Sequence, residues 1–125
     1  MNNPIGIRLK VDYFDNNENF AQFLPRVGTI SRQLSSIGGV TDWFLFDLDN
    51  SFDYQIRTNT SAEYKLLHCE QFLIRSRWQD HSITRKSETS VFILLIPDSE
   101  LLCVEPIDPA KFYHVAWGMI HPFEY

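Results

Sequence analysis

The stretch of residues 40–56, VTDWFLFDLDNSFDYQI, constrains the fold most, because it holds the densest apolar run in the first half of the chain. Over 43–48 nearly every side chain is apolar, and successive side chains of a strand point to opposite faces, so both faces need cover. The Asp-Asn-Ser triplet at 49–51 is typical of a turn. Apolar and polar residues then alternate over 52–57, as in a strand with one wet face. The stretch therefore predicts a β-hairpin with an acidic tip.

A short motif with possible chemistry lies inside the same stretch. The apolar run ends in Asp-Leu-Asp-Asn-Ser at 47–51, which resembles the first motif of the haloacid-dehalogenase family of phosphatases and phosphotransferases. The resemblance implies that Asp47 is a nucleophile that accepts a phosphoryl group, that Asp49 is the general acid/base, and that both lie beside a magnesium ion. It also implies a parallel, doubly wound sheet with alternating helices and strands. A magnesium-dependent, phosphatase-like enzyme that uses Asp47 and Asp49 is therefore one alternative function.

Apolar residues recur every three or four positions between residues 20 and 37, which is the spacing of one apolar stripe on an α-helix. They are Phe20, Phe23, Leu24, Val27, Ile30, Leu34 and Ile37. Pro25 interrupts the pattern, because proline removes a backbone donor inside a helix but is tolerated at the first helical position. The pattern therefore predicts either one kinked helix or two helices that meet at Pro25, with an end at the Gly-Gly pair 38–39.

Alternating or continuous apolar runs predict strands in most of the remaining chain. These strands are expected over 5–13, 70–78, 91–96, 101–105 and 115–120. Residues 61–69 fit either a short helix or a strand, because a capping-box spacing there competes with a period of two. Asp108 followed by Pro109 has the residue types that begin a short helix.

Together these elements predict a single α+β domain over residues 1–125. One long N-terminal amphipathic helix, continuous or broken at Pro25, is expected to pack on a curved, mainly antiparallel sheet of about six strands. Apolar residues such as Trp43 and Leu95 are expected on both faces of the sheet, so a second subunit is expected to cover the face away from the helix.

The charge balance argues against some classes of ligand. The net charge is −5 and the isoelectric point is about 5.2, so binding to nucleic acid or to an anionic membrane is not expected. The longest aliphatic and aromatic run, 91–96, is too short to span a bilayer, and no secretory signal pattern opens the sequence. The only two cysteines, Cys69 and Cys103, lack CxxC spacing and are expected to be buried, reduced thiols of a cytoplasmic protein.

No catalytic residue, metal site or cofactor is predicted for the favoured interpretation, and no pair among the four histidines His68, His81, His114 and His121 has the spacing of a recognised zinc motif. Residues far apart in the sequence can still meet in the fold. Whether Cys103 and His114 form a Cys–His pair therefore stays open.

Aromatic residues supply the candidate binding site. They make up 14% of the chain, and Trp and Tyr bring apolar area and a polar handle to interfaces. The expected ligand- or partner-binding residues are Trp43, Tyr54, Trp78, Tyr113 and Trp117. These features predict a small acidic, non-catalytic binding module that acts through a protein partner or through self-association, for example as a homodimer. The alternative is a small-molecule-binding protein that holds an apolar or aromatic ligand in an aromatic pocket between the helix and the sheet.

Overall fold

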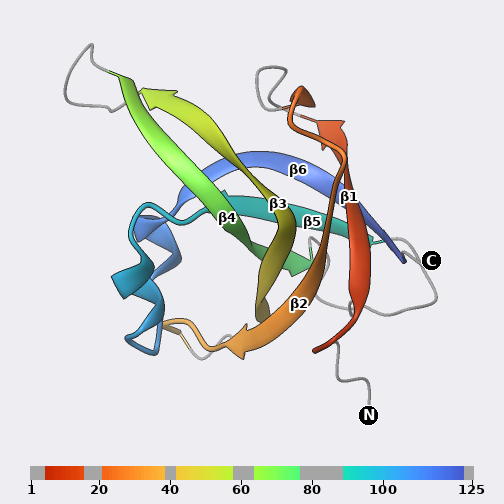
Figure 1. Cartoon of the computed structure of the whole chain (residues 1–125). Coiled ribbons are helices and arrows are strands. Elements are labelled where there is room, and N and C mark those ends of the chain that lie inside the picture. Colours follow the sequence, from red (N-terminus) through yellow and green to blue (C-terminus); the bar gives the residue numbers. More distant parts are fainter. Residues whose placement is uncertain (1–4, 16–20, 39–41, 58–63, 77–88, 123–125) are drawn as a thin grey trace.

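Six antiparallel strands form a closed barrel in the computed structural model, which describes residues 5–15, 21–38, 42–57, 64–76 and 89–122 (Figure 1). Each strand pairs with the next along the chain, and β6 closes the barrel by pairing with β1. The strands are β1 (Arg8–Asp15), β2 (Arg26–Leu34), β3 (Trp43–Arg57), β4 (Tyr64–Ser76), β5 (Thr89–Leu95) and β6 (Tyr113–Pro122). Two short 3-10 helices, η1 (Ser99–Leu102) and η2 (Pro109–Lys111), lie between β5 and β6.

The predicted α+β fold is wrong. The apolar period between residues 20 and 37 does not mark a helix, because residues 26–34 form β2. The period arises from residues that lie in different environments: Ile30 points into the barrel, Leu34 packs on its outside, and Ile37 is exposed. A bulge at Ser31 shifts the alternation between the first two, so the strand loses its simple period of two. Val27, Thr29 and Ile30 are β-branched and suit a strand.

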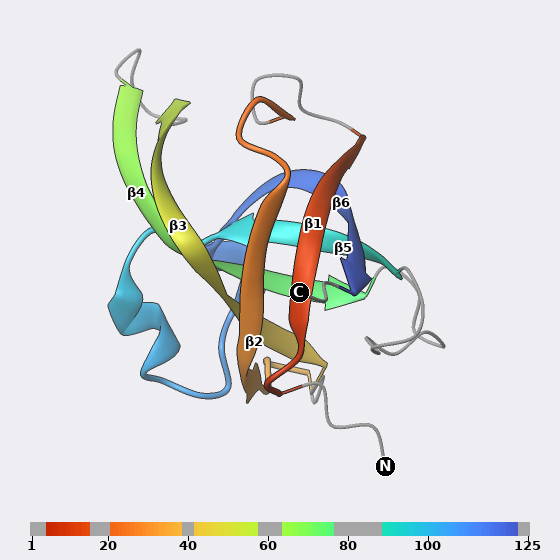
Figure 2. The same cartoon turned by 45° about the vertical axis from the view of Figure 1, so that its right-hand side comes forward.

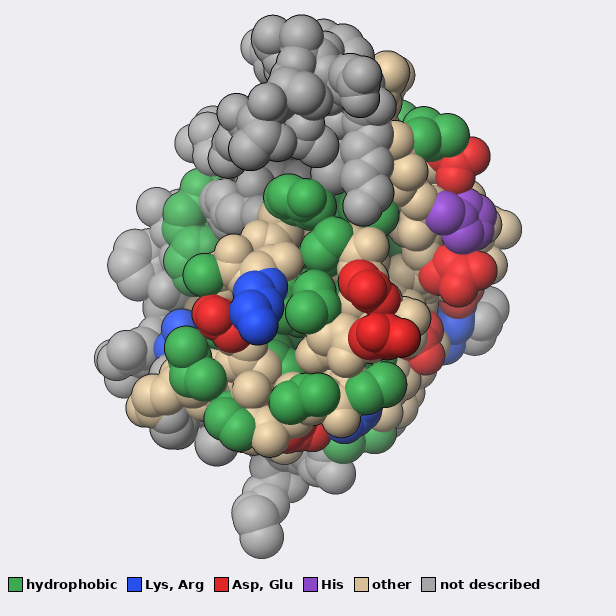
Figure 3. Space-filling model, turned by 90° about the vertical axis from the view of Figure 1, so that its left-hand side faces the viewer, with side chains coloured by type: hydrophobic (Ala, Val, Ile, Leu, Met, Phe, Trp, Pro, Cys, Tyr) green, Lys and Arg blue, Asp and Glu red, His purple; other side chains and the backbone are tan. Residues whose placement is uncertain are grey.

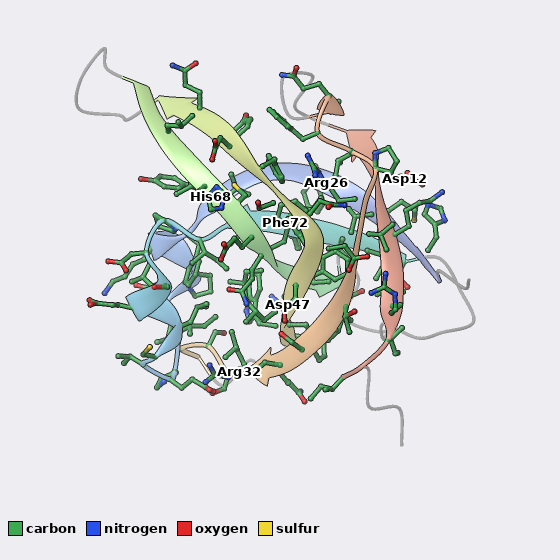
Figure 4. All side chains as sticks on the ribbon, in the orientation of Figure 1. Asp12, Arg26, Arg32, Asp47, His68 and Phe72 are labelled. Atoms are coloured by element: carbon green, nitrogen blue, oxygen red, sulfur yellow. The ribbon has the colours of Figure 1, made fainter. Side chains whose placement is uncertain are left out.

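The interior of the barrel is filled by its own side chains. Alternate residues of every strand point inward, and the largest fully buried ones include Phe46, Phe72, Leu9, Ile30 and Ile93. Small barrels are packed in this way because few strands enclose little space. Phe72 lies in the middle of this core (Figure 4), where its ring meets those of Phe46 and Phe52.

The predicted hairpin at residues 40–56 is also wrong, because β3 continues through the expected turn. Phe46, before the expected turn, and Phe52 and Tyr54, after it, all point inward. Residues 48–51 instead form a large bulge, since these four residues stand opposite the single residue Glu70 of β4. Beyond the bulge, β3 and β4 continue together as a two-stranded ribbon that projects past the other strands (Figures 1 and 2).

A second apolar cluster covers one part of the outside of the barrel. It consists of Leu34, Trp43, Leu45, Leu73, Leu94, Leu102, Ile107 and Phe112. The last three come from the connection 96–112 between β5 and β6, so the chain itself covers this part of the outer face. Glu105 fastens this connection to β2 by accepting hydrogen bonds from the backbone N–H of Ser35 and from Arg32. The hydrogen bonds from Ser35 lower the pKa of Glu105 below its usual value.

Several smaller predictions have clear outcomes. Strands were correctly predicted near β1, β5 and β6, and residues 64–69 of the ambiguous stretch belong to β4. The predicted strand over 101–105 is wrong, because residues 99–102 form η1. The predicted helix start at Asp108 is confirmed, since its carboxylate accepts a hydrogen bond from the N–H of Ala110 and Pro109 opens η2. None of the helices in the described residues is long and apolar enough to cross a membrane.

Candidate functional site

Four neighbouring strands place two tryptophans, an arginine and a phenylalanine side by side on the outside of the barrel. Trp43 of β3 pairs with Arg75 of β4, Arg75 pairs with Phe92 of β5, and Phe92 pairs with Trp117 of β6. Directly paired residues share one face of a sheet, so these four side chains form a continuous row. We call Trp43, Arg75, Phe92 and Trp117 the aromatic row.

Close contacts hold the members of the aromatic row in place. The guanidinium of Arg75 lies 5.6 Å from the centre of the Trp43 ring, within the range of a cation–π contact. Arg75 Nε is also 2.9 Å from a carboxylate oxygen of Asp42. The rings of Phe92 and Trp117 are tilted against each other with their centroids 4.0 Å apart. Within the row, the side chain of Trp43 is buried, whereas those of Arg75, Phe92 and Trp117 are partly exposed.

Polar groups border the aromatic row on one side, two residues further along β5 and β6. There Ser90 of β5 pairs with Met119 of β6, and Met119 pairs with Asp12 of β1. Oδ2 of Asp12 lies 2.9 Å from Nε2 of His121 and 3.9 Å from the ammonium nitrogen of Lys10. The row is therefore an apolar and cationic centre with a charged margin on one side, which is the anatomy of many protein interfaces.

The structure brings together only some of the aromatic residues that the sequence suggested. Trp43 and Trp117 stand in the same row, separated by Arg75 and Phe92. Tyr54 points into the barrel near its projecting end, where its ring meets Phe23 edge to face. Tyr113 is exposed at the start of β6, where it pairs with Leu95. Trp78 lies outside the described residues.

Arg75 and Phe92 were not among the predicted site residues. Each of them lies on an outward position of its strand, and the period of two could have indicated that much. Their place beside Trp43 and Trp117 depends on the register between strands, which a short-range pattern does not contain.

The two aspartates of the Asp-x-Asp string are bound to neighbouring strands. Asp47 Oδ1 accepts hydrogen bonds from Ser31 of β2 at 2.9 Å and from Gln71 of β4 at 2.7 Å. Asp49 pairs with both terminal nitrogens of the Arg8 guanidinium, and this contact lowers the pKa of Asp49. Figure 4 shows Asp47 on β3, away from the interior. The parallel, doubly wound sheet that the resemblance to phosphatases implied is not the fold of this chain.

An acidic stripe runs along the outer face of the projecting ribbon. Nδ1 of His68 lies 2.7 Å from Oδ1 of Asp53 on the paired strand, and its Nε2 lies 3.4 Å from Glu70. All three side chains are exposed, and acidic groups surround a histidine on this side of the molecule (Figure 3). We call Asp53, His68 and Glu70 the acidic stripe.

The pKa of His68 is expected to exceed its ordinary value of 6.5, mainly because Asp53 accepts a hydrogen bond from the imidazolium. Since the folded-state pKa is the higher one, this pair stabilises the fold below pH 6.5, and the contribution is lost as the pH rises through the raised pKa. A ¹H–¹³C NMR titration should show the raised midpoint. Asp53→Asn should move it back toward 6.5, whereas Glu70→Gln should move it less. An unchanged midpoint in Asp53→Asn would contradict the assigned cause.

The two cysteines differ in environment. Cys69 is buried in the barrel as expected, and this burial raises the pKa of its thiol to about 12. Cys103 is exposed after η1, so the expectation of two buried thiols is wrong for it. The side chain of His114 is outside the described ones, and the structure therefore does not test the pairing with Cys103. Within the described part of the chain, no three His, Cys, Asp or Glu residues are grouped so as to hold a metal ion.

Comparisons with known proteins add no assignment. No protein-family model matches the chain, and neither a curated protein nor a solved structure shows significant similarity to it. The chemistry of the surface therefore carries the evidence for a function.

Proposed function

We propose that this protein is a non-catalytic protein-binding module whose partner contacts the aromatic row. One observation carries the proposal: four strands of a barrel whose interior is already full align two tryptophans, an arginine and a phenylalanine on the outside. Tryptophan and arginine are the residue types that most often dominate binding energy at protein interfaces. The alternative of an aromatic pocket between a helix and a sheet loses its basis, since residues 26–34 form a strand.

The contacts within the row support binding in a second way. A side chain that is already fixed loses little conformational entropy when a partner covers it. Arg75 is fixed between Trp43 and Asp42, and Trp117 is fixed against Phe92. The partly exposed members can therefore meet a partner surface without a large ordering cost. A different protein and a second copy of this chain are the two candidate partners, and the same substitution tests both.

Trp117→Ala is expected to weaken binding of the partner about 10- to 100-fold, because truncating a tryptophan at the centre of an interface typically removes about 1.4–2.7 kcal/mol. A photo-crosslinking residue at position 119, beside the row, would capture the partner in cells that express the protein naturally. Its affinity for the wild-type chain and the variant would then be measured by calorimetry with purified components. Sedimentation of the purified chain, with and without Trp117→Ala, covers the case of self-association.

Tyr113→Ala is the matched control, because Tyr113 is an exposed aromatic residue of the same strand but lies outside the row. Binding should persist in this variant, and thermal unfolding should show that both variants fold. Equal capture and equal affinity for the wild type and Trp117→Ala, with no change in oligomeric state, would refute the proposal.

A further inference from the structure

The edge of β4 continues beyond the end of its neighbour β5. The two strands pair only from Phe72 with Leu95 to Ser76 with Val91, and Pro97 then directs the chain away. Residues 64–71 of β4 therefore have β3 on one side, and none of the described strands pairs with them on the other. In an antiparallel strand every second residue directs its N–H and C=O to the same side. Part of the backbone of 64–71 is thus directed to the position that a longer β5 would occupy.

A cleft lies at this position. Its volume is about 320 Å³, and its lining consists of Leu67, His68, Cys69, Glu70, Gln71, Ile96, Pro97 and Ser99. Five consecutive residues of β4 form one wall, and the residues that follow β5 form the other. Figures 1 and 2 both show the ribbon of β3 and β4 extending past the point where β5 turns away toward η1. The cleft is therefore an extended site beside a strand edge.

The two sides of the β4 edge differ in chemistry. Leu67 and Cys69 point toward the apolar interior, whereas Leu66, His68 and Glu70 point outward. The outward side carries the acidic stripe. The residues next to Ser99 in the sequence, Asp98 and Glu100, are also acidic and exposed. Among the residues whose side chains the structure describes, no lysine or arginine lines the cleft. A strand added here would gain from apolar side chains on its inward side and from positive side chains on its outward side.

We propose that this edge binds an extended segment of a protein partner, which adds to β4 as a further strand where β5 ends. The segment is about six residues long, to match the length of 66–71, and alternates apolar residues with lysine or arginine. Backbone hydrogen bonds to β4 supply affinity, and the acidic stripe selects basic side chains at alternate positions. The β4 edge is separate from the aromatic row. A negative result at one surface therefore does not count against the binding proposed for the other.

The test uses three synthetic peptides of equal length with blocked ends. The first alternates lysine with valine, the second alternates glutamate with valine, and the third has the composition of the first with its lysines and valines in separate blocks. Binding is followed on the ¹⁵N-labelled full chain by chemical-shift mapping and amide hydrogen exchange. We expect the first peptide to shift residues 66–71 and 96–99, and to slow exchange of alternate amides within 66–71 by at least about tenfold. The other two peptides should do neither.

Substitutions separate strand addition from simple charge attraction. Glu70→Lys should weaken the lysine peptide about tenfold, because like charges then face each other. Trp117→Ala, on the other surface, should leave its affinity unchanged. Equal binding of the block peptide would show attraction without strand pairing and would overturn the proposal, as would the absence of shifts at 66–71. Protected amides in 66–71 of the chain alone, together with a dimer in sedimentation, would assign the edge to a second copy and equally overturn it.

Discussion

Phe72→Ala is expected to reduce the free energy of unfolding by about 3–5 kcal/mol, which is typical of an aromatic residue removed from a packed core. The side chain of Phe72 is fully buried, and its ring centroid lies 6.4 Å from that of Phe46 and 6.0 Å from that of Phe52. Alanine would leave a cavity in the middle of the barrel, because strands joined in a closed ring cannot collapse into it. Urea unfolding followed by circular dichroism would measure the loss.

Two further variants make the expected loss specific to packing. Leu66→Ala removes a side chain that is 66% exposed on the same strand, so its effect should stay within about 0.5 kcal/mol. Phe72→Leu keeps much of the apolar volume and should fall between the two alanine variants. A loss below about 1 kcal/mol in Phe72→Ala would show that the interior is not packed around this ring.

Local patterns in the sequence were sufficient for strands whose alternation is simple. The residues of β1 alternate between inward Leu9 and Val11 and outward Lys10, as the sequence predicted, and residues 91–95 of β5 form a continuous apolar run. The cap at Asp108 was also predictable, because the hydrogen bond from its carboxylate to the N–H of Ala110 involves residues two positions apart. These elements depend on interactions within a few residues.

The remaining elements depend on contacts between distant segments. Residues 49–51 have the composition of a turn, but β3 continues through them as a bulge because Phe52 and Tyr54 extend the inward row of the barrel. The helix-like period near β2 arises because Ile30 and Leu34 belong to two separate apolar clusters. Neither cluster can be recognised before the strands are placed, so local periodicity gave the wrong secondary structure there.

The candidate site shows the same division. The tryptophans at its two ends were identifiable by residue type, since Trp43 and Trp117 are prominent in the sequence. Their connection through Arg75 and Phe92 depends on three strand pairings. A change of one residue in any of these registers would move a member of the row to the other face of the sheet. The row is therefore a property of the register, and sequence patterns within single strands do not contain it.

Gly28→Ala is expected to destabilise the barrel by about 3 kcal/mol or more, at the upper end of the range for overpacking. A Cβ atom at this position would lie 2.2 Å from the backbone oxygen of Asp47 and 3.0 Å from the ring of Phe46. The obstructing atom belongs to the backbone of β3, so a rotamer change cannot remove the clash. Gly28 pairs with Leu48 beside it, and the strands would have to separate where Asp47 is tied to Ser31 and Gln71.

Gly38→Ala separates this crowding from the general cost of replacing a glycine. Gly38 has a positive φ of 86°, but a Cβ there would meet nothing within 4 Å, so the expected cost is the backbone strain alone, about 1–2 kcal/mol. Chemical denaturation of both variants should therefore rank Gly28→Ala as clearly the less stable. The opposite order would mean that β2 and β3 can separate at low cost. The close approach of these strands would then not be what keeps Asp47 in contact with both of its neighbours.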